Sequence, residues 1–381
     1  MISDRIYLDF NATTPPLDDV IDAQREAARA AWGNPSSIHA DGRRARALVE
    51  DARARVAELA GCDPRDVIFT SGGTEANNLA LRSAFSKTRG TLITSRLEHP
   101  SVVQVAEALA REEKADVRFC DVDANGAVDL ASIEKHLENA LPHLVFAIQA
   151  VNHETGIFQP LSEIFDIAFK RKAWMHVDAV QAFGRRDDVA VFATTRSISA
   201  HKIRGPKGIG ALMTLPDVKI EPVLRGGAQE RGIRPGTIDP VAAAGFAVAA
   251  VHAKTTAAAY ASKGALRDAL EAALVALGGQ VNGGQVKSGL NGGAPRAPHI
   301  TNVSFPKWIG AELVAALDLE GISISSGAAC SAGTIEPSPV ITAFAGEARA
   351  KSAVRISLGP TTTDAEIGCA IEAFRCVIAR V

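Results

Sequence analysis

The segment SISAHKIRGPKGIG, residues 197–210, places Lys202 directly after an apolar run and before a turn rich in Gly and Pro. Burial at the end of a strand disfavours the ammonium form of a lysine. The neutral amine is then a nucleophile toward a carbonyl group. Taken alone, the segment favours the ordinary alternative, a lysine that extends to the surface. Whether the Lys202 amine acts as a nucleophile therefore depends on the groups that lie beside it.

Two further segments supply groups of matching chemistry. HVDAVQA ends an apolar run with Asp178, whose carboxylate is costly to bury without a cationic partner. TSGGTEANN, residues 70–78, places hydroxyls and backbone N–H groups at the start of a helical pattern, an arrangement that binds phosphate. Taken one at a time, a solvated aspartate and an ordinary strand-to-helix turn also explain these segments.

Together, the three segments meet the requirements of pyridoxal phosphate. The lysine forms a Schiff base with the aldehyde, the carboxylate keeps the ring nitrogen protonated, and the turn holds the phosphate. A protonated ring withdraws electrons from a bound amino acid. The combination predicts a pyridoxal-phosphate site.

The elements that must position these groups alternate between strands and helices. Apolar runs predict strands at residues 66–70, 91–95, 116–122, 144–151, 174–180, 197–200 and 209–214. Helical patterns connect them, and Asp129 is a predicted N-cap. We therefore expect an α/β fold with a doubly wound, mostly parallel seven-stranded sheet flanked by helices. Ligands of such sheets bind at the carboxyl ends of the strands.

A smaller α+β domain is predicted after this sheet. An Ala-rich helical pattern runs from Pro240 to about Leu277 with a break near Gly264, and a Gly-rich surface loop follows it. Further strands are predicted at 301–305, 322–326 and 353–358, and helices at 310–320, 337–345 and 363–380. We expect residues 15–255 to form the large domain, and residues 1–14 together with 256–381 to form the small one.

Composition narrows the class of protein. A chain of 381 residues with 47% hydrophobic and 22% charged residues is expected to be soluble and globular. A formal net charge of -2 favours small-molecule or protein partners over nucleic acid or a membrane surface. The N-terminal segment lacks the pattern of a signal peptide, and we expect no membrane-spanning stretch and a cytoplasmic location.

Five cysteines occur at positions 62, 120, 330, 369 and 376, without a CxxC pair. Their number and spacing argue against a disulfide framework and a zinc site, so we expect no metal. Cys369 and Cys376 are predicted to be packing residues of the last helix. Cys330, in SSGAACSAGT, lies among small residues that allow an exposed thiol. Taken alone, Cys330 is also consistent with a small buried residue in a tight loop.

The sequence resembles the cysteine desulfurases of the NifS/IscS type, which belong to class V of the fold-type-I pyridoxal-phosphate enzymes. The motifs that carry the resemblance span nearly the whole chain in order: YLDFNATTPP, GNPSSIHADG, FTSGGTEANN, EHPSV, VNHETG, HVDAVQAFG, SAHKIRGPKGIGAL, GGAQERGIRPGT, SSGAACSAG and AVRISLG. The resemblance implies that the protein converts L-cysteine to L-alanine and leaves a persulfide on Cys330. It also implies a homodimer with shared active sites and a sulfur-acceptor partner such as an iron-sulfur scaffold protein.

The resemblance assigns roles to individual residues. Lys202 would carry the cofactor, Asp178 would pair with the ring nitrogen, and Gln181 would bind the ring hydroxyl oxygen. His99 would stack on the ring and help to move protons. The cofactor-binding set that the resemblance implies is completed by Gly73, Thr74, Ser199, His201, His153 and, from the neighbouring subunit, Thr237. The substrate-binding set is Arg355, Asn152 and Asn11, with Arg355 holding the substrate carboxylate.

One departure from the family pattern concerns His153, which stands where the family has the second of two asparagines. Its imidazole is expected to replace the amide hydrogen bond and, by titrating near neutral pH, to make the site pH-sensitive. Two alternatives remain open. A selenocysteine lyase or a class V aminotransferase would share the cofactor residues, although the aminotransferase would not need Cys330. An inactive scaffold that binds a sulfur-acceptor protein is the alternative outside the enzymes.

Overall fold

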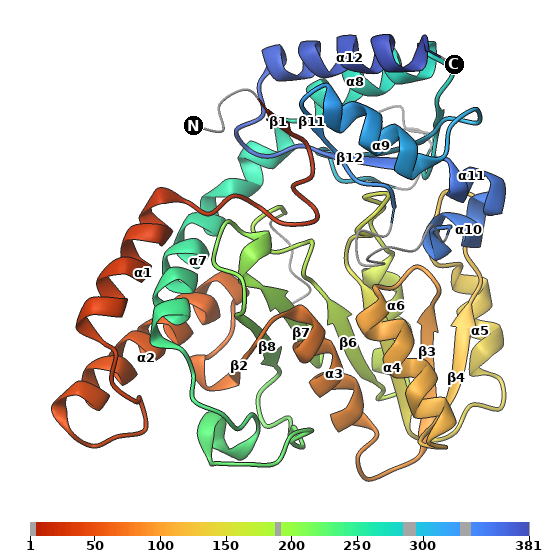
Figure 1. The fold of residues 1–381 in the computed structure, drawn as a ribbon. Coiled ribbons are helices and arrows are strands. Elements are labelled where there is room, and N and C mark those ends of the chain that lie inside the picture. The colour runs from red at the N-terminus through yellow and green to blue at the C-terminus, as the bar shows by residue number, and fades with distance from the viewer. Residues whose placement is uncertain (1–4, 187–191, 285–294, 328–336, 381) are drawn as a thin grey trace.

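A sheet of seven strands lies at the centre of the computed structural model, which describes residues 5–186, 192–284, 295–327 and 337–380 (Figure 1). The order across the sheet is β2-β8-β7-β6-β5-β3-β4. Only β8 runs antiparallel to its neighbours, which confirms the predicted mostly parallel α/β sheet. The strands are β2 (Val67–Thr70), β3 (Gly90–Ser95), β4 (Ala115–Cys120), β5 (Leu144–Gln149), β6 (Trp174–Asp178), β7 (Thr195–Ser199) and β8 (Gly210–Thr214).

The central sheet is buried on both faces: every residue of β2, β3, β5, β7 and β8 is buried. Strands of this kind usually appear in a sequence as nearly continuous apolar runs, which made β2, β5 and β8 predictable. β7 differs, because its sequence TRSIS buries mostly polar side chains, Arg196 among them. The register places Thr70, Gly210 and Ser199 side by side at one edge, and Asp178 pairs with Ser197.

Helices cover the sheet, with α3 and α4 in front of it and α1, α2 and α7 at the left of Figure 1. Side-chain caps start several of them: Asp129 accepts a hydrogen bond from Ala131 N at 2.9 Å, as predicted for α5. The helices of this part are α1 (Asp18–Ala30), α2 (Ala40–Ala60), α3 (Gly73–Ala84), α4 (Pro100–Arg111), α5 (Leu130–Leu137), α6 (Leu161–Lys170) and α7 (Pro240–Ala261).

Helix α7 corrects the expectation that no stretch of the chain is long and apolar enough to span a membrane. Among the described residues it is the one helix long and apolar enough to cross a membrane by length and composition. Half of its apolar window is buried, and α7 packs against α1 and α2. A core helix of a globular protein passes the same test of length and composition, so α7 gives weak evidence for a membrane span.

A second, smaller group of elements lies above the sheet in Figure 1. It is built on the antiparallel sheet β12-β10-β9 and on the parallel pair of β1 and β11. Leu8, Val303 and Phe374 belong to its apolar core, so the N-terminal strand packs with the C-terminal elements. The domain boundaries remain a prediction. The elements are β1 (Ile6–Tyr7), α8 (Gly264–Ala276), β9 (Gln280–Val281), β10 (Ile300–Ser304), α9 (Gly310–Leu319), β11 (Ile322–Ser323), α10 (Pro339–Ala345), α11 (Glu347–Lys351), β12 (Ala353–Ser357) and α12 (Asp364–Ile378).

The cysteines of α12 are not packing residues, contrary to our prediction. Cys369 and Cys376 are both exposed. The buried face of α12 carries Ile367, Ala370 and Phe374, and the two cysteines lie off that face. They are therefore accessible thiols that any chemical test of Cys330 must take into account.

Candidate active site

A cavity of about 310 Å³ opens at the carboxyl ends of β6 and β7, at the edge of the sheet that the sequence indicated. Its walls come from both groups of elements, since Arg355 lies on β12 and Asp178 on β6. The predicted site residues that line it are Asn11, Gly73, Thr74, His99, His153, Asp178, Gln181, Ser199, His201, Lys202 and Arg355.

An anion site adjoins this cavity at the start of α3. A second space of about 370 Å³ is bordered by Gly72, Thr74, Ser199 and Lys207. The first-turn N–H groups of a helix have no acceptor within the helix and carry partial positive charge. A Cβ on Gly210 would lie 2.7 Å from Gly72 Cα, so only glycine lets the turn approach the sheet this closely. The arrangement suits a phosphate group.

His201, at the same end, is neutral around pH 7. Burial, with help from the charges of Lys202, Lys207 and Arg185, lowers its pKa to about 3. Its Nδ1 lies 3.1 Å from Thr13 Oγ1. A neutral imidazole contributes a hydrogen bond to an anion, and Lys207 contributes the charge.

Asp178 ends β6 with both carboxylate oxygens hydrogen-bonded. Asn77 Nδ2 donates to Oδ2 at 2.8 Å, and the backbone N–H of Val180 donates to Oδ1 at 3.0 Å. These two donors fix the orientation of the carboxyl group. The carboxylate lines the cavity and is suited to pair with a protonated ring nitrogen.

Lys202 ends the short 3₁₀ turn Ala200–Lys202 that follows β7. Its Nζ donates to the backbone carbonyls of Asn11 at 2.5 Å and Ala12 at 2.9 Å. Both acceptors belong to the N-terminal segment, which brings residues almost 200 positions away to the amine. The amine is therefore held at the cavity wall by neutral acceptors.

A buried arginine that the sequence analysis missed lies behind Lys202 and Gln181. Arg185 donates to Asn11 Oδ1 at 2.6 Å and to the carbonyl of Phe10 at 3.0 Å, and it also contacts Gln181 Oε1. These acceptors are all neutral oxygens, and burial lowers the pKa of the guanidinium. No pattern in the sequence distinguishes this arginine from a surface one. It fixes the orientation of Asn11 and Gln181.

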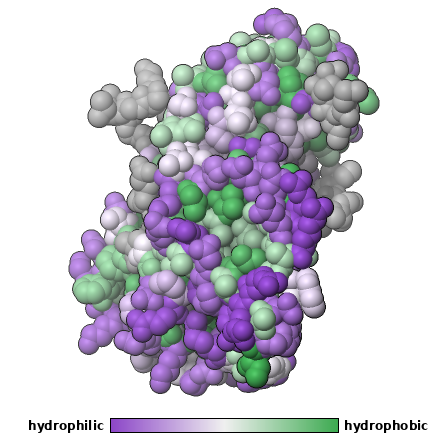
Figure 2. Space-filling model, turned by 90° about the vertical axis from the view of Figure 1, so that its left-hand side faces the viewer, coloured by the Kyte–Doolittle hydropathy of each residue, from purple (hydrophilic) through white to green (hydrophobic). Residues whose placement is uncertain are grey.

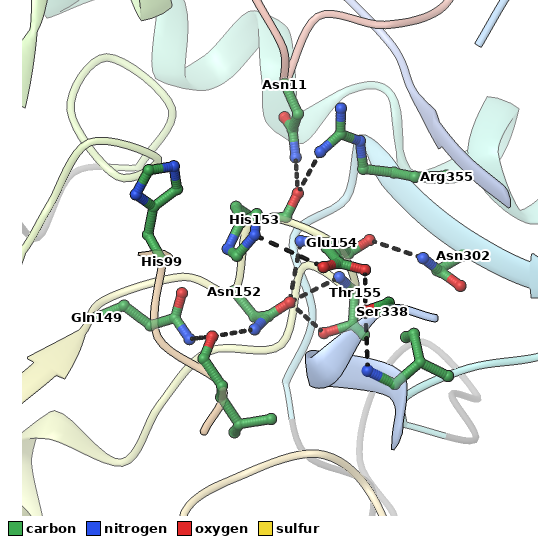
Figure 3. Close-up of polar contacts among 12 residues, drawn as sticks. Asn11, His99, Gln149, Asn152, His153, Glu154, Thr155, Asn302, Ser338 and Arg355 are labelled. Atoms are coloured by element: carbon green, nitrogen blue, oxygen red, sulfur yellow. Dashed lines mark hydrogen bonds and ion pairs between the residues drawn. The ribbon is translucent and has the colours of Figure 1, made fainter. Parts of the chain in front are cut away.

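His99 and His153 form one wall of the cavity, as Figure 3 shows. Their rings pack edge to face with centroids 5.5 Å apart. Burial lowers the pKa of both, and it holds the pKa of His153 well below its usual value, with positive neighbours adding to the effect. The prediction that His153 titrates near neutral pH is therefore wrong, because a buried imidazole beside Lys202 and Arg355 stays neutral.

Arg355 is already part of an ion pair. Its Nη2 lies 2.7 Å from Asp9 Oδ1, and its Nη1 donates to the carbonyl of His153 at 3.0 Å. Asn11 Nδ2 donates to the same carbonyl at 3.0 Å (Figure 3). The Nε of Arg355 is a buried donor that has no hydrogen-bond partner among the described residues. Arg355 thus keeps a donor for an incoming carboxylate.

Comparison with known proteins places this arrangement in a family. The model of the family described as aminotransferase class-V matches residues 6–369. The chain belongs to the class-V aminotransferase family. A mitochondrial cysteine desulfurase of Saccharomyces cerevisiae is 39% identical to it over 97% of this chain and 74% of the yeast protein. An IscS-like cysteine desulfurase of Mycobacterium tuberculosis is 35% identical over 98% of this chain and 96% of that protein.

A solved structure of a NifS-like protein has the same fold as this class-V chain. Its TM-score is 0.88 at 30% identity, over 99% of this chain and 100% of the other. Pyridoxal phosphate is the cofactor of these enzymes, and the cavity fits it: a helix N-terminus with Thr74 and Ser199 for the phosphate, Asp178 for the ring nitrogen and Lys202 for the aldehyde. Among the described residues no cluster of His, Cys, Asp or Glu suits a metal ion.

Two residues implied by the class-V resemblance lie outside the cavity lining, and a third falls outside the described residues. Asn152 does not line the cavity, and its amide is already used: Oδ1 accepts from the N–H groups of Glu154 and Thr155 in its own turn, and Nδ2 donates to Leu97 O on another segment. The expected substrate contact of Asn152 is therefore not supported. Thr237 is exposed and outside the lining. Cys330 lies outside the described residues.

Glu154 is a further residue that the sequence analysis missed. It is 1% exposed and accepts a hydrogen bond from Ser338 Oγ at 2.7 Å (Figure 3). Ser338 is the N-cap of α10, so this hydrogen bond connects the turn of Glu154 to the start of that helix.

Proposed function

We infer that this protein is a pyridoxal-phosphate-dependent cysteine desulfurase, which removes the sulfur atom of L-cysteine and releases L-alanine. The observation that carries this conclusion is the single cavity that brings an amine, a carboxylate, an anion site and an arginine together. Cysteine desulfurases at 35% and 39% identity over almost the whole chain support it. The same evidence favours an enzyme over an inactive scaffold.

The residues of the cavity have different roles, which follow from their positions. Bound pyridoxal phosphate supplies an electron sink that weakens the bonds at the substrate Cα. Lys202 Nζ is the amine nearest to that chemistry, and Asp178 balances the charge of the ring nitrogen. Arg355 offers Nε to the substrate carboxylate while Asp9 and the His153 carbonyl hold the rest of its guanidinium in place.

We propose Cys330 as the group that receives the sulfur. In the net reaction, the Cys330 thiol and L-cysteine give a Cys330 persulfide and L-alanine, so the Cβ–S bond of the substrate breaks, an S–S bond forms, and Cβ gains a hydrogen. Small residues flank Cys330 in SSGAACSAGT, a sequence in which little side-chain bulk lies next to the thiol. The thiolate is the reactive form of the cysteine.

We also propose a homodimer in the cytoplasm that passes its sulfur to a protein acceptor such as an iron-sulfur scaffold. Large apolar side chains are exposed on the connection between α1 and α2, where Trp32 and Ile38 are 72% and 87% exposed. Figure 2, which views the left-hand side of Figure 1, shows hydrophobic residues in several small patches among hydrophilic ones. A second copy of the chain would cover such residues and bring Thr237 close to a neighbouring site.

The experiment that tests the function uses the protein loaded with pyridoxal phosphate. It is expected to convert L-cysteine to equal amounts of L-alanine and, with a reductant, sulfide. Borohydride should attach the cofactor to the Lys202 peptide, and Lys202→Ala should abolish both turnover and attachment. An assay with L-selenocysteine separates a desulfurase from a selenocysteine lyase. A loaded protein that produces no alanine from L-cysteine would refute the proposal.

A further inference from the structure

A continuous chain of buried polar side chains runs from the sheet to the start of α4, and its last three members, Asn77, Ser101 and His99, line the cavity. It begins at Thr195 on β7, passes through His176 on β6 and Asn77 on α3, and reaches Ser101 and His99 at the start of α4. Thr195 and His176 are 0% exposed, and Asn77 is 1% exposed. Buried polar groups are costly unless they are satisfied, so their donors and acceptors must match.

Asp178 determines the orientation of the Asn77 amide. Asn77 Nδ2 lies 2.8 Å from Asp178 Oδ2 and 2.9 Å from Ser101 Oγ. A carboxylate only accepts hydrogen bonds, so the NH₂ group of the amide has to face it. The flipped amide would place two acceptor oxygens against each other. The Asn77 oxygen must therefore point the other way, toward His176.

The tautomer of His176 follows from this orientation. Its Nε2 lies 3.0 Å from Asn77 Oδ1, an acceptor, so Nε2 carries the proton. Its Nδ1, 3.0 Å from Thr195 Oγ1, then accepts the hydrogen of the hydroxyl. Burial lowers the pKa of His176 to about 4, which agrees with a neutral ring that needs only one donor nitrogen.

The tautomer of His99 follows in the same way from the orientation of Asn77. Ser101 Oγ accepts from Asn77, so its own hydrogen is available for His99 Nδ1, which lies 2.7 Å away. The backbone N–H of Ser101 also donates to Nδ1, at 3.1 Å. Two donors converge on this nitrogen, and it therefore carries no hydrogen. A neutral His99 has its proton on Nε2.

We propose that Asn77 is a positioning residue that links Asp178 to His99 through Ser101 and holds His99 with its proton on Nε2. The inference rests on the proposed function for its meaning: it makes Nε2 of neutral His99 the proton donor that faces the cavity, and it leaves the ring no free nitrogen to act as a base. Asn77 and Ser101 also line the cavity, but the role proposed here is to orient other side chains. The effect of Asn77 passes through the two side chains that it orients.

Nitrogen-15 NMR of the holoenzyme, labelled at its nine histidines, tests the protonation states directly. The His99 and His176 signals are assigned by their loss in His99→Gln and His176→Gln. Both rings are expected to be neutral with the proton on Nε2 from about pH 6 to 8. Asn77→Ala should shift the His176 Nε2 signal, because it removes the acceptor of that proton. This measurement does not depend on desulfurase activity.

Kinetics of matched variants test the effect on the reaction. Asn77→Ala and Ser101→Ala are each expected to lower kcat about tenfold, a part of what a positioned proton donor contributes, with KM changed less than about twofold. Ser101→Thr keeps the hydroxyl and should restore the rate. The double variant should lose less than the product of the two single losses, since both act on His99 through one path. Asn78→Ala is the control, because the neighbouring Asn78 side chain donates only to Thr74 O on the exposed side of α3.

These experiments distinguish a failure of the proposed hydrogen-bond network from a failure of the proposed function. A His99 proton on Nδ1 in the wild-type holoenzyme, or Asn77→Ala with an unchanged His176 signal and wild-type kcat, would overturn the proposal. Cofactor content and thermal unfolding of each variant identify any that fail to fold, and Ser101→Thr then carries the comparison. If the protein does not act on L-cysteine, the NMR result still decides the network, while the proposed function alone fails.

Discussion

At the scale of single residues, Glu98 is the carboxyl group whose protonation is most affected by burial beside the cavity. It is 2% exposed, and Oε2 has no hydrogen-bond partner among the described residues. Burial raises its pKa well above the usual value, and the charge of Asp178 adds to the effect. The folded protein therefore keeps a proton on Glu98 over a pH range in which the unfolded chain has released it.

The pH dependence of the free energy of unfolding tests whether Glu98 stays protonated in the folded protein. Because the folded state binds more protons, the contribution of Glu98 is fully present below the pKa of the unfolded chain and is lost as pH rises toward the folded pKa, by up to about 1.4 kcal/mol per pH unit. Glu98→Gln has no such dependence. Its free energy of unfolding should rise relative to wild type between about pH 5 and 8 in urea titrations. Parallel curves would contradict the prediction, and exposed Glu134→Gln is the control.

Arg355 gives a second prediction at this scale. Arg355→Lys keeps a charge near Asp9 but loses the Nε donor and the planar guanidinium that Asp9 and the His153 carbonyl hold in place. KM for L-cysteine is expected to rise roughly tenfold or more, with a smaller change in kcat. Exposed Arg375→Lys, on α12, should leave both constants unchanged. An unchanged KM in Arg355→Lys would mean that the substrate carboxylate binds elsewhere.

Residue roles were only partly predictable from the sequence. Eleven of the expected residues line one cavity. Lys202, Asp178 and the Gly-rich turn at Thr74 were expected from the patterns of strand ends and turns, whereas the resemblance to the family supplied the others. Asp9, Arg185 and Glu154 were missed because their partners are far away in the chain: Arg185 reaches Asn11, for example. Asn152 was assigned to the substrate because a motif does not show whether an amide is used up by its own turn.

At the scale of secondary-structure elements, a buried ion pair connects α2 to the turn at Gln229–Gly232. Arg53 contacts both carboxylate oxygens of Glu230, at 2.6 and 2.8 Å, and Glu230 also accepts from Phe69 N on β2 at 2.7 Å. The side chains are 7% and 2% exposed. Glu230 has a left-handed φ of 44°, a conformation that its contacts must maintain.

Removing one residue of the Arg53–Glu230 pair should lower the free energy of unfolding more than removing both. Glu230→Ala leaves the Arg53 charge buried and is expected to lower the free energy of unfolding by ~3–5 kcal/mol. Arg53→Met combined with Glu230→Ala should be closer to wild type, because no charge remains unpaired. Urea unfolding of the three variants decides this. A double variant as unstable as the sum of the single ones would show that the two residues act independently.

The elements themselves follow from the sequence to the extent that they are long and apolar. All seven strands of the main sheet were predicted within two residues or so at each end, and the break before α8 was placed correctly. The two-residue strands β1 and β9 are too short to have a period, and only their partners define them, whereas β11 lies within the strand predicted at 322–326. Helix α7 has no separate polar and apolar faces, so amphipathic periodicity did not identify it as a helix. Its long Ala-rich sequence was the only guide.

At the scale of the whole molecule, the cavity exists because the chain closes on itself. The N-terminal segment supplies the carbonyls that hold Lys202, and β12 supplies Arg355. Glu154 and Ser338 join the sheet side to α10. The active site therefore depends on the relative position of both groups of elements, and a sequence motif alone describes only one wall of it.

The most direct test of the account is the fate of the sulfur atom. Holoenzyme is treated with one equivalent of L-cysteine, digested, and the masses of its cysteine peptides are measured beside the amount of L-alanine released. The account predicts one added sulfur on the Cys330 peptide, in proportion to the alanine, and none on the peptides of the exposed Cys369 and Cys376. Alanine released at the wild-type rate by Cys330→Ala, or sulfur found on another cysteine, would contradict it.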